Sequence, residues 1–142
     1  MALCGVEISG KEIRLAIVVN GDEGAFALRA VETKKIILSD EKNSDSIRTF
    51  LRAITAFAHE NGVDQFVLKD RARGGAFAGG AVSFKIEALL QALEGCAVTF
   101  VNAVVLSKFA KTNAAGLPLG MPKYLQDACR CGAFKLNLDK GA

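Results

Sequence analysis

The sequence lacks any long apolar run. No stretch approaches the roughly 18 to 20 apolar residues that a membrane-spanning helix needs. Met1 is followed at once by a strand-like pattern, not by the charged segment and hydrophobic stretch of a signal peptide. We therefore expect a cytoplasmic protein without a membrane partner.

The sequence also has little metal-binding chemistry of the zinc type. Its four cysteines, Cys4, Cys96, Cys129 and Cys131, form no C-x-x-C pair. A zinc site built from Cys129, Cys131 and the single histidine, His59, would still need another ligand. Buried, reduced thiols are the favoured interpretation.

No phosphate-binding signature of the common kinds is present. Residues 66–93 read FVLKDRARGGAFAGGAVSFKIEALLQAL, an apolar run followed by a basic, glycine-rich stretch and an amphipathic pattern. The stretch has neither the Gly-Lys-Ser/Thr ending of a Walker sequence nor the G-x-G-x-x-G order of a dinucleotide turn. The charged residues of this stretch are therefore expected to serve a different function from binding a nucleotide in either of these ways.

The bulk composition is that of one folded domain. The chain has 142 residues, of which 51% are hydrophobic, so we expect a single domain over residues 1–142. Lys and Arg number 18 against 15 Asp and Glu, a net charge of +3. That charge is compatible with a polyanionic partner but does not require one.

Hydrophobic periodicity predicts a mixed α/β order without repeats. Strands are expected at 3–9, 12–19, 26–38, 63–70 and 96–101, and helices at about 44–61, 80–94, 103–111 and 123–136. Short turns make the first three strands antiparallel, and crossovers through helices make the others parallel. The prediction is one mixed five-stranded sheet flanked by helices, with the first strand in the centre beside 63–70.

Three acids lie where this topology can bring them together. Glu7 is on the first strand, on the face opposite Val6 and Ile8; Asp70 ends the fourth strand; Asp127 is on the last helix. Converging carboxylates repel one another, and Mg²⁺ or Mn²⁺ would offset that repulsion with the oxygen ligands these ions prefer. We therefore expect a divalent-metal site.

The sequence resembles a known superfamily at three places. CGVEISG at 4–10 resembles the first strand of the RuvC type of Holliday-junction resolvase, GGAFAGGAVSFKIEA at 74–88 resembles a bacterial family of short RuvC-like domains without assigned function, and DACR at 127–130 resembles the resolvases' D-A-x-D. The resemblance covers about residues 3–136. It implies a ribonuclease H-like fold and a metal-dependent nuclease that hydrolyses phosphodiesters with two ions about 4 Å apart.

The resemblance also implies roles for individual residues. Glu7, Asp70 and Asp127 would hold the metal ions, with Lys123 orienting a phosphate or the attacking water. Nucleic acid, with DNA favoured, would be bound by residues of and around the glycine-rich stretch: Lys69, Arg71, Arg73, Phe77 and Lys85. Resolvases of this type act as dimers, so a homodimer is expected as well.

Departures from the resolvase pattern leave a second interpretation open. Lys69 occupies a place where the resolvases more often carry Glu, so the side of the strand on which Asp70 falls is not fixed. Arg130 replaces a fourth acid and is spaced to pair with Asp127. The alternative is a catalytically inactive ribonuclease H-like module that binds nucleic acid or a protein. Glu87 is expected to be a solvated helix acid.

Overall fold

The computed structural model describes residues 2–70 and 80–140. Its regular elements, in chain order, are β1 (Ala2–Ser9), β2 (Glu12–Asn20), β3 (Phe26–Leu28), β4 (Lys35–Ile37), α1 (Ser44–Asn61), β5 (Val63–Lys69), α2 (Ala81–Gln91), β6 (Ala97–Val101), α3 (Ala103–Thr112) and α4 (Gln126–Lys140). A 3₁₀ turn, Lys123–Leu125, leads directly into α4.

The sheet has the predicted mixed topology, with one more strand than expected. Its order is β3-β2-β1-β5-β6, and β4 also pairs with β2. β1 lies in the centre, antiparallel to β2 and parallel to β5, as predicted. The predicted third strand is two short strands, because the polar stretch 29–34 breaks the apolar alternation between them. β3 pairs with Val18–Asn20 and β4 with Glu12–Arg14.

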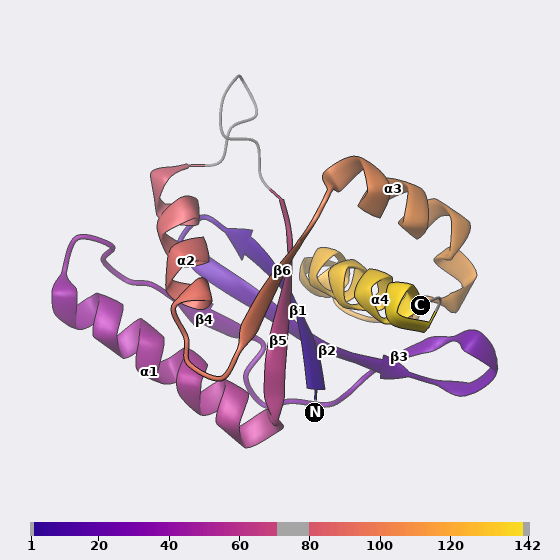
Figure 1. The fold of residues 1–142 in the computed structure, drawn as a ribbon, viewed down its shortest axis with the longest axis horizontal. Coiled ribbons are helices and arrows are strands. Elements are labelled where there is room, and N and C mark those ends of the chain that lie inside the picture. Colours follow the sequence, from indigo (N-terminus) through magenta and orange to yellow (C-terminus); the bar gives the residue numbers. More distant parts are fainter. Residues whose placement is uncertain (1, 71–79, 141–142) are drawn as a thin grey trace.

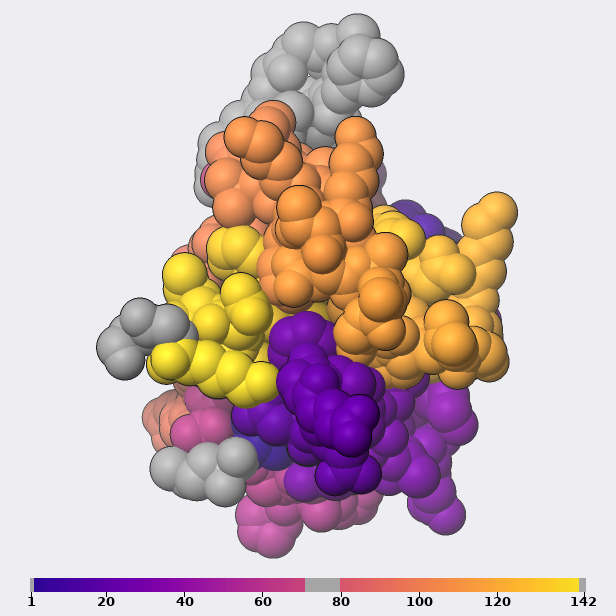
Figure 2. Space-filling view, turned by 90° about the vertical axis from the view of Figure 1, so that its right-hand side faces the viewer, coloured from indigo at the N-terminus to yellow at the C-terminus, as the bar shows by residue number. Residues whose placement is uncertain are grey.

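Helices cover both faces of the sheet (Figure 1). α1 and α2 lie on one face and α3 and α4 on the other, and Figure 2 shows α3, the end of α4 and β3 exposed on one side of the molecule. Asn43 caps α1 by accepting a hydrogen bond from the Ser46 N–H, and Gly62, at φ 64°, ends it. The chain then enters β5 at once.

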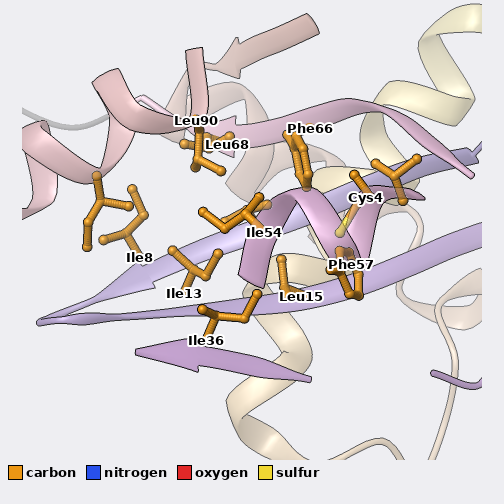
Figure 3. Packing of buried hydrophobic residues seen from close by; sticks show 14 of the residues in the cluster. Cys4, Ile8, Ile13, Leu15, Ile36, Ile54, Phe57, Phe66, Leu68 and Leu90 are labelled. Atoms are coloured by element: carbon orange, nitrogen blue, oxygen red, sulfur yellow. The ribbon is translucent and has the colours of Figure 1, made fainter. Parts of the chain in front are cut away.

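The larger core fills the space between the sheet and α1 and α2. Side chains from alternate positions of the central strands meet apolar side chains of the helices there (Figure 3). The buried set includes Cys4, Ile13, Leu15, Ile54, Phe57, Phe66, Leu68 and Leu90. Full burial of each such side chain contributes about 1.5–3 kcal/mol, so this layer supplies much of the folding free energy.

The opposite face depends on an unusually close approach of α4 to β1. A Cβ atom built on Gly5 would lie 1.7 Å from the carbonyl oxygen of Ala128. One built on Gly132 would lie 2.7 Å from Cγ2 of Val18. Both glycines are therefore required by space, because any side chain would push the helix off the sheet.

Three of the cysteines have the predicted character. Cys4, Cys129 and Cys131 are buried, Cys96 is half-buried, and all four are free thiols. Burial raises the pKa of Cys129 to about 11 and that of Cys131 to about 12, so these thiols are protonated and unreactive at neutral pH. Within the described ranges, no helix has the length and apolar character needed to cross a bilayer.

Candidate functional site

Two acids far apart in sequence meet where β1 and α4 pack together. Glu7 lies on β1 on the same face as Gly5, and Asp127 lies in the first turn of α4, one residue before Ala128. Since the backbone of Ala128 rests directly on Gly5, the start of α4 brings the Asp127 carboxyl close enough to Glu7 to act on its pKa, and both acids line the same small pocket. We call Glu7 and Asp127 the acidic pair.

Each acid of the pair is also held by an arginine. Arg14 lies on β2, directly opposite Glu7 on β1. Its Nη1 donates to Glu7 Oε1 at 3.2 Å, and its Nε donates to Glu12 Oε2 at 2.8 Å. Arg130 donates from Nη1 to Asp127 Oδ1 at 3.0 Å, one helical turn along α4. The pairing of Arg130 with Asp127 that the sequence spacing allowed is therefore present.

The environment of Glu7 works against its ionised form. Burial raises the pKa of Glu7, and the neighbouring Asp127 carboxyl raises it further, while Arg14 acts in the opposite direction without cancelling these effects. Only 24% of the Glu7 side chain is exposed. The charge of Glu7 is therefore sensitive to pH above the usual range of a glutamate.

This arrangement predicts a pH-dependent effect of Glu7→Gln on stability. A raised pKa in the folded state means that ionised Glu7 disfavours folding. The contribution of Glu7 to the free energy of unfolding is therefore fully present below its unfolded pKa and is lost as pH rises through the folded pKa. We expect the free energy of unfolding of Glu7→Gln, relative to the native protein, to be more favourable at pH 7.5 than at pH 4.5. Urea denaturation at both values measures it. An unchanged difference between the two pH values contradicts the raised pKa.

The third predicted acid, Asp70, does not line the pocket shared by Glu7 and Asp127. Phe66 and Leu68 of β5 belong to the core beneath α1 and α2, whereas Val67 packs on the α3 and α4 side. The parallel register pairs Val6 with Leu68, so Lys69 follows on the same face as Glu7. Asp70 follows the last residue of β5, and its N–H donates to the Val101 carbonyl at 2.7 Å; continued alternation would send its side chain to the face of Leu68.

The structure thus brings together Glu7 and Asp127 but not Asp70. In residues 2–70 and 80–140, no group of three or more Asp, Glu, His or Cys side chains is placed to hold a metal ion. Instead, Lys69 lines the small pocket of about 30 Å³ between Glu7 and Asp127. That volume is enough for one water or one ion.

Two larger hollows adjoin the acidic pair. A groove of about 300 Å³ between α3 and α4 is lined by Lys69, Lys111 and Arg130 together with Asp127. An open groove of about 640 Å³, which we call the Tyr124 groove, lies beside it. Its lining residues are Glu7, Arg14, Lys123, Tyr124, Gln126, Asp127 and Arg130. Cations therefore outnumber acids around the pair.

The remaining predicted residues lie in different places. Lys123 lines the Tyr124 groove. Lys85 lies on α2, in the other helical layer, and its Nζ donates to the Glu41 carboxylate at 2.6 Å. Glu87 is 4% exposed, so the expectation of a solvated helix acid was wrong: the side chain is buried. Arg71, Arg73 and Phe77 lie outside the described residues.

Sequence reasoning missed Arg14 and Tyr124. The signal for Arg14 was available, because a two-residue turn at Gly10 and Lys11 pairs Ser9 with Glu12 and hence Glu7 with Arg14. Tyr124 had no such signal, since only the packing of the 3₁₀ turn against β2 places its ring beside Arg14.

A family model described as protein of unknown function (DUF3010) matches residues 1–135. The chain belongs to this family. Its assignment confirms the predicted resemblance to short RuvC-like domains without assigned function. No curated protein matches the sequence closely enough to count as a relative.

Solved structures show the same fold at low sequence identity. RuvC from Thermus thermophilus is similar with a TM-score of 0.69 and 13% identity, over 99% of this chain and 96% of RuvC. The same protein in complex with a Holliday junction gives 0.69 and 14%, over 100% and 97%. The fowlpox virus Holliday junction resolvase gives 0.53 and 15%, over 99% of each chain. These likenesses confirm the ribonuclease H-like fold of the DUF3010 chain.

Proposed function

We propose that this protein binds nucleic acid, DNA in preference to RNA, across the face where β1 meets the start of α4. The observation that carries the proposal is the identity of the residue beside Glu7 on the neighbouring strand, which is Lys69 and not an acid. With Arg14 and Arg130 paired to the two acids, the further cations around the acidic pair favour an anionic ligand, such as a nucleic-acid backbone, along this face.

The charges around the pocket are arranged to follow a polyanion. Lys69, Lys111 and Lys123 are exposed, so their ammonium groups are free to contact phosphates without the cost of leaving a buried ion unpaired. They lie on three different elements around the acidic pair. The likeness to a resolvase solved with a Holliday junction supports nucleic acid as the polyanion.

The donor set fits one divalent ion better than two. Mg²⁺ is commonly held by one or two carboxylates together with substrate phosphates. Glu7 and Asp127 would hold such an ion, Mg²⁺ or Mn²⁺, and the ion would supply positive charge against a bound phosphate. A two-ion site needs further carboxylates, and none joins the pair among the described residues. We therefore derive no hydrolytic step.

Salt dependence of DNA binding tests the proposal. We expect a labelled four-way junction to bind at low salt, with affinity falling steeply as NaCl rises. Lys69→Gln and Lys123→Gln should each lower the slope of log K against log salt by about one. Lys140→Gln, at the other end of α4, makes the same charge change and should leave the slope unaltered. No binding of DNA or RNA at low salt overturns the proposal.

A metal-dependent nuclease is the second candidate, favoured by the Glu7 and Asp127 carboxyl groups that line one pocket. Incubating the junction with the protein and Mg²⁺ or Mn²⁺ distinguishes the two. Binding without cleavage supports the non-catalytic module. Cleavage that Glu7→Gln abolishes selects the nuclease instead.

A further inference from the structure

We propose that the Tyr124 groove holds an unpaired nucleobase of the bound strand, stacked on the Tyr124 ring. The inference rests on the proposed nucleic-acid binding and names the part of the ligand that this groove takes. Three kinds of group line this one groove: the aromatic ring of Tyr124, cations such as Lys123, and the side-chain amide of Gln126.

The groove has the size and the chemistry for a nucleotide. Its volume of about 640 Å³ lies within the range of roughly 300–1,000 Å³ that is typical of small-molecule sites. Lys123 supplies positive charge for the phosphate, while Arg14 and Arg130, which also line the groove, offset the charges of Glu7 and Asp127. Gln126 lies beside Tyr124 and carries both a donor and an acceptor, as recognition of a base edge requires.

The position of Tyr124 suits a stacking platform. Its ring is half-buried, and the residue belongs to the 3₁₀ turn Lys123–Leu125, which Leu125, only 4% exposed, anchors to the core. The turn packs against β2 on one side and continues into α4 on the other. A ring held this way loses little further freedom when a base stacks on it.

The ring already receives a cation. Lys35 of β4 places its Nζ 4.3 Å from the centre of the Tyr124 ring. Lys35 is exposed, and exposed cation–π contacts are weak. A base can therefore displace the ammonium group, which then remains close enough to contact a phosphate.

The geometry selects for bases that are not paired. Bases in an intact duplex are stacked inside it, so one that reaches Tyr124 must first leave the stack, and the cost is lowest for a base that is already unpaired. Aromatic stacking is also tolerant of base identity. The groove should therefore prefer single strands, or junctions with unpaired nucleotides, over closed duplexes.

The chain contains one tyrosine and no tryptophan, so its intrinsic tyrosine fluorescence reports on Tyr124 alone. We expect an unstructured thymidine oligonucleotide to quench this emission, and a closed hairpin duplex with the same number of phosphates to leave it nearly unchanged. In parallel, anisotropy of labelled oligonucleotides measures affinity for the native protein, Tyr124→Phe and Tyr124→Ala.

The variants separate stacking from charge. Tyr124→Ala should weaken single-strand binding by about tenfold or more, in line with stacking on an aromatic side chain, and should leave duplex binding unchanged. Tyr124→Phe keeps the ring and should bind within about threefold of the native protein. A strand of abasic sites should bind the native protein as weakly as the thymidine strand binds Tyr124→Ala.

Failure takes two distinguishable forms. If the single strand binds but neither quenches Tyr124 nor responds to Tyr124→Ala, the stacking inference is overturned and nucleic-acid binding stands. If neither the single strand nor the duplex binds at low salt, the proposed function fails and the inference fails with it.

Discussion

Replacing Gly5 by alanine is expected to lower the free energy of unfolding by about 3 kcal/mol or more. The added methyl group would meet the backbone oxygen of Ala128 at 1.7 Å, and a helix backbone cannot move aside as a flexible side chain can. α4 must therefore shift away from β1. Urea denaturation at constant pH measures the loss.

The same substitution should also disturb the acidic pair. Because Asp127 precedes Ala128, a shift of α4 takes its carboxyl away from Glu7, and the pH-dependent effect of Glu7→Gln should shrink in the Gly5→Ala background. Gly116→Ala is the matched control, since the nearest atom to a Cβ there, the Gly24 carbonyl oxygen, lies at an ordinary contact distance of 3.6 Å. It should change stability by less than about 0.5 kcal/mol. A Gly5→Ala loss as small as that would show that α4 moves freely.

Lys69→Asp is expected to create a strong divalent-metal site. It places a third carboxylate beside Glu7 on the same face of the sheet, at the spacing of about 4.8 Å between neighbouring strands, and removes a cation from the pocket. With Mn²⁺ at 100 times its dissociation constant, the folded state gains about 2.7 kcal/mol. For a chain of this length that gain raises Tm by about 10 °C.

An Asp70→Asn variant tests whether Lys69 or Asp70 faces the acidic pair. Thermal melts with and without Mn²⁺ should show a much smaller shift for the native protein than for Lys69→Asp, and Asp70→Asn should leave the native response unchanged. A native shift as large as that of Lys69→Asp, lost in Asp70→Asn, would show that Asp70 reaches the metal and that the alternation along β5 does not continue through it.

The sequence was sufficient for the topology because its signals are periodic and local. Alternation in residues 3–9 and 63–70, together with helical crossovers, placed β1 beside β5. The two short strands β3 and β4 were predicted as one, because the residues on either side of 29–34 are apolar. In the structure they are separate, and each pairs with a different part of β2. Helix bounds differed by only a few residues.

The site was harder to predict, because a shift of one residue along β5 changes which side chain faces the acidic pair. Lys69 and Asp70 are adjacent in sequence, and alternation along a strand sends adjacent side chains to opposite faces. The three-acid hypothesis therefore depended on which of the two faces Glu7, and the pattern at the end of a strand does not determine this. The proximity of Glu7 to Asp127 followed from the predicted packing of the last helix. The metal ions, the homodimer and the cytoplasmic location stay predictions.

The turn at Gly10 and Lys11 determines which charge faces Glu7, although neither of its residues touches the acidic pair. Because the pairing of β1 with β2 is counted outward from this turn, one inserted residue would slip the register and send every side chain of β2 to the other face. Arg14 would enter the apolar layer, and an aliphatic neighbour would stand opposite Glu7. The length of the turn between β1 and β2 therefore determines which residue offsets the charge of Glu7. Relatives with longer hairpins should offset the charge of this acid by other means.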